Sequence, residues 1–224
     1  MLRRAGRALS APVAVGRSAP LVDEWGRAQS LIDVVMPLLF ARWDVSVGGS
    51  EHLPRHGGAL IVANARRFAH TSIYAALSIG DTVGRPVRFA GRSDMAPLGA
   101  LARRIGGLLE HPDEVSGALR AGELVLITTA ATGSSAHAGT VDPAMMRAAA
   151  RAGVAVHPAA TESSPTSREA RVEIAAPVVT ERPRRGPLAE ADMADAVQRR
   201  LQELLDEMGD ARPGVPVLDW LRGS

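Results

Sequence analysis

The sequence contains no cysteine and no lysine, and these two absences exclude several kinds of chemistry. Without cysteine there is no thiol nucleophile, disulfide, thiolate-bound zinc or cysteine-ligated iron–sulfur cluster. Without lysine there is no Schiff base with a carbonyl substrate, no pyridoxal phosphate linkage and no P-loop lysine. All 26 basic residues are therefore arginine, and with 24 acidic residues the formal net charge is only +2.

Aromatic residues and long apolar runs are also scarce. Aromatic side chains make up 3% of the chain, which leaves few platforms on which single-stranded nucleic acid could stack. Together with the low net charge, this argues against a nucleic-acid partner. No segment reaches the roughly 18 consecutive apolar residues that a membrane-spanning helix needs. The longest apolar stretch, 31–40, is interrupted by Asp33 and Pro37, so we expect no transmembrane span.

The first 43 residues divide into two parts. Residues 1–22 carry four arginines and no acid, which predicts a basic, disordered tail, with a transit peptide as the alternative. Residues 23–43 have apolar side chains at helical spacing and predict an amphipathic helix that Pro37 kinks. Two interpretations of this helix stand: it packs on the protein core, or it lies in a membrane interface with Phe40 and Trp43 at headgroup depth.

The rest of the chain alternates between short apolar strands and helices. Alternation of this kind predicts a single α/β domain with a mostly parallel sheet flanked by helices, and 224 residues with 46% hydrophobic content can bury such a core. We place the domain at 23–182, followed by a C-terminal helix and tail at 183–224. The expected strands are 44–48, 59–63, 86–90, 107–110, 124–128, 154–158 and an edge strand at 171–174; the expected helices are 71–79, 98–105, 111–122, 144–151 and 188–208.

Three segments, in order, resemble the lysophospholipid/glycerolipid acyltransferase family. They are VSVGGSEHLPRHGGALIVAN at 45–64, RPVRFAGRSDMAPLGALARRIGGLLEHPDEVSGALRAGELVLI at 85–127, and AGVAVHPAA at 152–160. The DEWGR at 23–27 also resembles the lead-in of a bacterial branch. The resemblance covers about 23–180 and implies a glycerolipid-acyltransferase-like fold. It also implies acyl transfer from acyl-CoA or acyl carrier protein to a lysophospholipid or glycerol-phosphate hydroxyl.

The family's catalytic residues are replaced in this chain. The family places a general-base His and its orienting Asp, as His-x4-Asp, directly after the Asn that matches Asn64. Here the His position is Ala65, and the Asp position is His70, or Ser72 on a longer spacing. The family's second motif, Phe-Pro-Glu-Gly-Thr, falls on 128–132, where Pro, Glu and Gly become Thr129, Ala130 and Ala131. Thr132 alone retains the family's residue.

Other residues offer weaker routes to catalysis or binding. His137 and Asp142 have the His-x4-Asp spacing after the wrong strand, and Asp142 before Pro143 is explained as a helix N-cap. His70 could act as a base without an Asp partner, or lie exposed at a helix start. His157 lies on a buried strand, where a hydrogen-bonded core histidine is the ordinary interpretation. The scattered histidines predict no metal site and we expect no resident cofactor.

Two arginines follow Ala65, which stands at the family's His position. Arg66 and Arg67 could bind a phosphate or carboxylate together with Thr132, as an anion or head-group site, because guanidinium groups pair bidentately with such anions. The alternative is a pair of solvated loop residues.

The sequence therefore predicts an acyltransferase-family protein of phospholipid or glycerolipid metabolism that is catalytically inactive. Such a pseudoenzyme would bind lipid or acyl groups, or regulate an active acyltransferase partner. The alternative is a divergent active acyltransferase that uses acyl-CoA or acyl carrier protein as co-substrate. We expect a cytoplasmic location, with peripheral contact with the inner face of the membrane as a further alternative.

Overall fold

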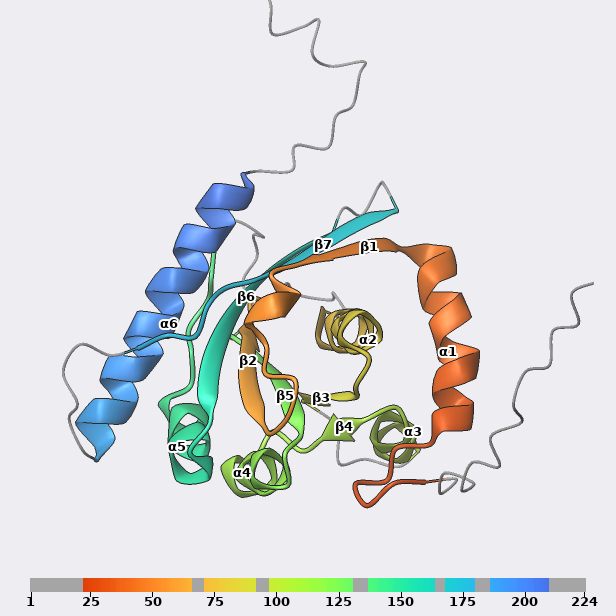
Figure 1. Cartoon of the computed structure of the whole chain (residues 1–224), viewed down its shortest axis with the longest axis horizontal. Helices are drawn as coiled ribbons and strands as arrows, with labels where there is room; N and C mark the ends of the chain where they lie inside the picture. Colours follow the sequence, from red (N-terminus) through yellow and green to blue (C-terminus); the bar gives the residue numbers. More distant parts are fainter. Residues whose placement is uncertain are drawn as a thin grey trace, which may run out of the picture.

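The structure is a computed structural model and shows an α/β domain built on one seven-stranded sheet (Figure 1). It describes six ranges of the chain, and all structural statements below concern them: 22–65, 71–91, 97–130, 137–163, 168–179 and 186–209.

The strands follow the order β1-β7-β6-β2-β5-β3-β4 across the sheet. Every neighbouring pair is parallel except β6 and β7, which run antiparallel. The mostly parallel sheet and the single-domain α/β class predicted from the sequence are confirmed. The strands are β1 (Asp44–Gly48), β2 (Ala59–Ala63), β3 (Val87–Ala90), β4 (Gly107–Leu108), β5 (Leu124–Thr128), β6 (Ala155–Ser163) and β7 (Glu169–Ile174).

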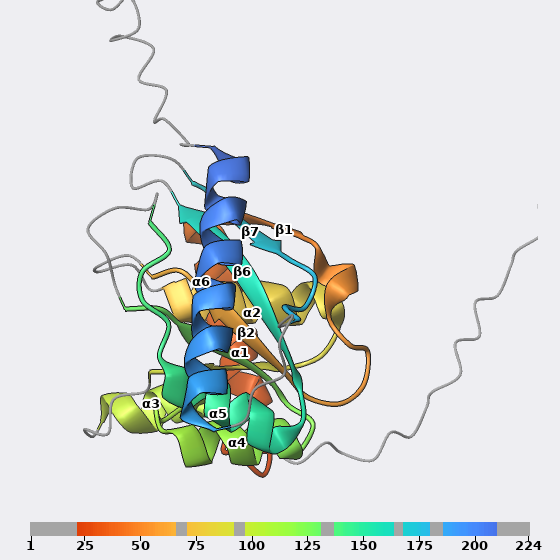
Figure 2. The same ribbon diagram turned by 90° about the vertical axis from the view of Figure 1, so that its left-hand side faces the viewer.

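Helices cover both faces of the sheet, because alternate residues of each strand point to opposite sides. In β2, Ile61 packs in the cluster that contains α1 and α2, whereas Leu60 and Val62 pack in the cluster that contains α4, α5 and α6. Figure 2 shows α6 running in front of β6, next to α5. The helices are α1 (Gln29–Arg42), α2 (Thr71–Val83), α3 (Leu98–Arg104), α4 (Pro112–Arg120), α5 (Pro143–Ala152) and α6 (Pro187–Met208), with a short 3-10 turn at Ser50–His52.

Several expected elements differ in their bounds or place, and three of these differences have a cause in the contacts of the chain. The helix predicted from residue 23 begins at Gln29, because the Asp23 carboxylate accepts hydrogen bonds from the backbone of Trp25 and Arg27 and closes a turn instead. Strand β6 continues to Ser163, because β7 pairs with its second half. Strand β7 is not at the edge of the sheet, since β1 pairs with its other side.

The N-terminal helix divides its residues between core and surface. Ile32 is buried in the core, while Val34 and Leu38 are 61% and 67% exposed. Trp43, just after the helix, packs against Tyr74 with 5.5 Å between ring centroids. The core-packing interpretation therefore holds for one face of α1 and for Trp43, while contact with a membrane interface stays a prediction.

Candidate functional site

Strands β2 and β5 lie side by side and end at the same edge of the sheet. Their register pairs Ala63 with Thr128, so Asn64 and Thr129 come next on the two strands, and Ala65 follows one residue later beside the Thr129 side chain. The Thr129 N–H donates to the Ala63 carbonyl oxygen at 2.9 Å. In open α/β sheets, ligands bind at the carboxyl ends of the strands, so this edge is the candidate site.

The Thr129 side chain connects the two strand ends to a later segment. Its hydroxyl oxygen accepts a hydrogen bond from the Ala65 N–H at 3.3 Å and donates to the Ala138 carbonyl oxygen at 2.6 Å. Thr129 is 4% exposed. The hydroxyl is therefore committed to the backbone on both sides.

Residues 137–141 run across the end of β5. The Ala130 N–H donates to Thr140, and the Ala138 N–H donates to the Gln202 side chain of α6 at 3.0 Å. Gly139 has a φ of 75°, and a Cβ there would lie 2.7 Å from the Thr129 hydroxyl. This segment can cross so closely only because residue 139 is a glycine.

Asn64 joins β2 to β6. Its side-chain amide donates to the Thr161 carbonyl at 3.0 Å and accepts from the Thr161 N–H at 2.6 Å, while the Thr161 hydroxyl lies 3.0 Å from the same amide oxygen. Both residues are buried. The asparagine that the resemblance places before the catalytic position is thus a cross-link between strands.

The structure describes part of the predicted site. Ala65 is half-buried, Ala130 is exposed, and Ser72 is the second residue of α2 and half-buried. None of these three positions carries an imidazole or a carboxylate. The remaining predicted positions lie outside the described residues: Arg66, Arg67, His70, Ala131 and Thr132.

The structure does not bring His137 and Asp142 together as a pair. Both side chains are exposed, and within the described residues no hydrogen bond or ion pair joins them. The Asp142 carboxylate instead accepts from the Ala144 N–H at 2.8 Å and caps α5, as predicted from Asp142-Pro143. Asp142 also acts with burial to raise the pKa of Glu110, which sequence reasoning did not single out.

His157 is a core histidine, as predicted. Its ring is 1% exposed, and its Nδ1–H donates to the Ala175 carbonyl oxygen at 3.2 Å. Burial lowers the pKa of His157, and the charge of His52 lowers it further, while the hydrogen bond opposes both. A neutral imidazole held in this way lies in the sheet and is no general base for the strand-end site.

A buried arginine at the opposite end of the sheet was not foreseen. Arg88 of β3 is 1% exposed and forms ion pairs with Asp23 and with Glu123. Burial alone lowers the pKa of Arg88, but the hydrogen bonds that its guanidinium donates to Glu123 and Asp23 outweigh burial and raise the pKa. The signal in the sequence was an arginine inside an otherwise apolar strand, VRFA. The cluster attaches the 23–27 turn to the sheet.

No group of three His, Asp or Glu side chains in the described ranges is arranged to hold a metal ion. Nor does any helix in those ranges have the length and apolar content that crossing a membrane requires.

Comparison with solved structures places the fold beside a known enzyme. The chain is similar to the crystal structure of the 1-acyl-sn-glycerophosphate (LPA) acyltransferase PlsC from Thermotoga maritima, with a TM-score of 0.58 and 16% sequence identity. The similarity covers 81% of this chain and 83% of the Thermotoga chain. No family model and no curated protein matches the sequence. This chain therefore has the fold of a glycerophosphate acyltransferase.

Proposed function

We propose that this protein is a non-catalytic relative of the glycerolipid acyltransferases that binds a lipid or acyl group, or regulates an active acyltransferase. The observation that carries the proposal is the side chain at the end of β2. After Asn64, where the resemblance requires a histidine, the chain has Ala65, which can neither accept nor position a proton.

The contacts around this position support a structural role for the strand ends. The Ala65 N–H is bound by the Thr129 hydroxyl, and that hydroxyl is bound by Ala138. Thr129 stands where the family motif has its proline, and Ala130 stands where it has its glutamate. In the described residues, the polar groups at this edge therefore pair within the chain.

The rate expected for such a site is low. Removal of a positioned general base costs about 10²–10⁴ in rate, and the orienting carboxylate is replaced as well. His70 in the family's Asp position would have to act without an acidic partner. The fold is retained while the residues of the family's mechanism are not, which is the pattern of a pseudoenzyme.

Peripheral contact with a membrane belongs to the same proposal. Val34 and Leu38 lie one helical turn apart on α1 and are 61% and 67% exposed, so they form an apolar strip that could enter a lipid interface. Co-sedimentation with vesicles containing anionic phospholipid tests this contact. We expect the Val34→Ser/Leu38→Ser double variant to bind vesicles less than the wild type; equal binding would contradict the contact.

Acyl transfer by the purified protein tests the proposal. Labelled long-chain acyl-CoA would be supplied with a panel of lysophospholipid and glycerol-phosphate acceptors, and we expect no product above background. An Ala65→His/His70→Asp/Ala130→Glu variant assayed beside it tests whether the replaced residues limit the reaction. Clear turnover by the natural protein would establish the alternative, a divergent acyltransferase, and His70→Ala and His137→Ala would then identify the histidine responsible.

A further inference from the structure

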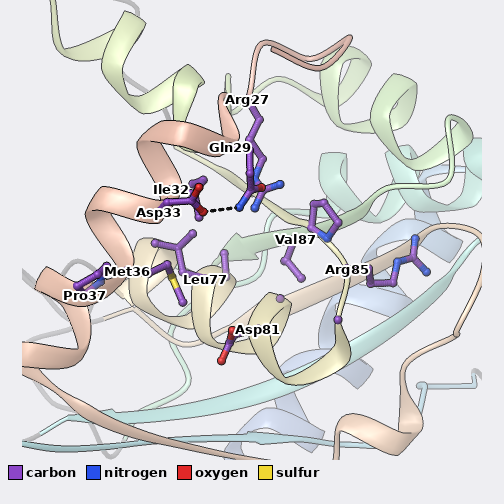
Figure 3. A pocket seen from close by; sticks show the side chains of 14 residues that line it. Arg27, Gln29, Ile32, Asp33, Met36, Pro37, Leu77, Asp81, Arg85 and Val87 are labelled. Carbon is purple, nitrogen blue, oxygen red and sulfur yellow. Dashed lines mark hydrogen bonds between the residues drawn. The ribbon is translucent and has the colours of Figure 1, made fainter. Parts of the chain in front are cut away.

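A cavity of about 570 Å³ lies between α1 and α2, at the amino end of β3 and on the opposite edge of the sheet from the Ala65 site (Figure 3). Its volume is within the range of small-molecule sites. Apolar side chains from both helices and from β3 form one wall of it: Ile32, Met36, Leu77 and Val87.

Arg27 supplies a positive charge to this cavity. Its side chain is half-buried, and none of the described residues accepts a hydrogen bond from its guanidinium group. The Cδ atoms of Arg27 and Arg88 lie 3.7 and 3.9 Å from the position that a Cβ on Gly106 would take, and burial followed by the Arg88 charge lowers the pKa of Arg27. The two carboxylates that pair with Arg88 are Asp23 and Glu123. The charges of Asp23, Glu123 and Asp33 oppose the effects of burial and of Arg88, but none of the three carboxylates accepts a hydrogen bond from Arg27, so its N–H groups remain available to a ligand.

Arg85 also lines the cavity but is already paired. Its guanidinium donates to the carbonyl oxygens of Pro54, Gly57 and Gly122 at 3.0, 3.0 and 2.6 Å. Figure 3 shows this side chain pointing away from Arg27. Arg85 fixes the turns that precede β2 and β5 and leaves Arg27 as the cation available to a ligand.

Two carboxylates stand at the exposed rim of the cavity. Asp33 of α1 accepts a hydrogen bond from Gln29 at 2.9 Å. Asp81 of α2 is exposed, and no described residue donates to it. The cavity thus presents a half-buried positive group, an apolar wall and an exposed negative group to the same space.

We propose that this cavity binds an amphiphile with a zwitterionic head group, its phosphate or carboxylate against Arg27, its ammonium toward Asp81 and its alkyl part on the apolar wall. An anion beside Arg27 would offset the repulsion from Arg88. Asp33 and Asp81 would repel a head group that carried only negative charge. Arg27 would repel a head group that carried only positive charge. The site deepens the lipid-binding part of the function proposed above, but none of its lining residues belongs to the Ala65 site, so the titration below and the acyl-transfer assay can fail separately.

Calorimetric titration of the full chain with three eight-carbon probes below their micelle concentrations tests this site. The probes are octylphosphocholine, octyl phosphate and octyltrimethylammonium, and we expect the zwitterion to bind more tightly than either of the others. Tighter binding of octyl phosphate or of the alkyl cation would overturn the head-group assignment.

Four variants separate the parts of the site. Arg27→Gln should weaken octylphosphocholine binding about tenfold while leaving the melting temperature close to that of the wild type, because the Arg27 guanidinium donates no hydrogen bond to a described residue and its loss removes both the repulsion from Arg88 and the attraction to Asp23, Glu123 and Asp33. Asp81→Asn should bring the affinity of the zwitterion down to that of octyl phosphate. Met36→Trp should weaken binding, because the larger ring projects from the apolar wall into the space of the alkyl chain. Arg199→Gln, a matched charge change at an exposed position of α6, should change nothing.

Two results with these variants would contradict the proposed site. Wild-type affinity for octylphosphocholine in Arg27→Gln or in Met36→Trp would overturn the proposal. An equal loss of affinity in Arg199→Gln would do the same, because it would show a general effect of net charge.

Discussion

Substitution of Asn64 should lower the free energy of unfolding through a small set of identified hydrogen bonds. Asn64→Ala would leave the buried N–H and carbonyl of Thr161 without their side-chain partners. Each unsatisfied buried group costs about 1–3 kcal/mol, so we expect a fall of about 2–4 kcal/mol in the free energy of unfolding. Urea denaturation measures it. Thr161→Val, which removes only a hydroxyl, should cost about 1 kcal/mol; an Asn64→Ala effect no larger than that would contradict the cross-link.

His157 should make folding stability depend on pH. Its pKa is lowered in the folded protein, so below the ordinary imidazole pKa of about 6.5 the unfolded chain takes up a proton that the folded chain resists. The stabilisation is present above that pH and is lost as the pH falls toward the folded-state pKa.

Urea denaturation between about pH 7.5 and 5 measures the effect, because this interval spans the imidazole pKa. We expect His157→Phe to flatten this part of the profile, while His56→Gln, at an exposed loop position, leaves it as in the wild type. An unchanged slope in His157→Phe would show that other groups cause the dependence.

At the scale of elements, the stability of α5 distinguishes the two interpretations of Asp142, as a helix N-cap or as a partner of His137. The carboxylate caps the helix through the Ala144 N–H, so Asp142→Ala should lower stability by about 1 kcal/mol. His137→Ala should leave stability unchanged, since its side chain is exposed. Equal losses in the two variants would contradict a pure capping role.

The attachment of the 23–27 turn to the sheet depends on Arg88. Arg88→Met would leave Asp23 and Glu123 without their cation, and removal of one partner from a buried pair costs about 3 kcal/mol or more. Thermal unfolding of this variant, beside Arg199→Met at an exposed position of α6, measures the difference. A loss no greater than that of Arg199→Met would show that the ion cluster does not hold the turn.

The sequence predicted elements well where one physical signal dominated. Continuous apolar runs identified β2 and β5, which are buried on both faces, and Asp142-Pro143 marked the start of α5. The predicted ends of elements were wrong where pairing with a residue distant in the sequence determines the end. The strand expected at 154–158 is longer in the structure, because pairing with β7 extends β6 to Ser163.

At the scale of the whole molecule, the fold followed from the alternation of strands and helices together with a resemblance in three ordered segments. The similarity to the Thermotoga acyltransferase extends over four-fifths of both chains, although only 16% of residues are identical. The sheet therefore keeps its arrangement with few shared side chains. Contacts such as Arg88 with Asp23 join residues 65 apart in the sequence, so no local pattern could reveal them.

The central proposal is that this chain, which has the fold of an acyltransferase, does not carry out acyl transfer. Its most direct test is the rate of acyl transfer by the wild-type protein at high concentration, with an intact 1-acyl-sn-glycerophosphate acyltransferase as the positive control. The proposal predicts a rate at background, or at least about 10²–10⁴ below the control. A rate comparable to the control that is lost in His70→Ala would contradict it and establish a working enzyme.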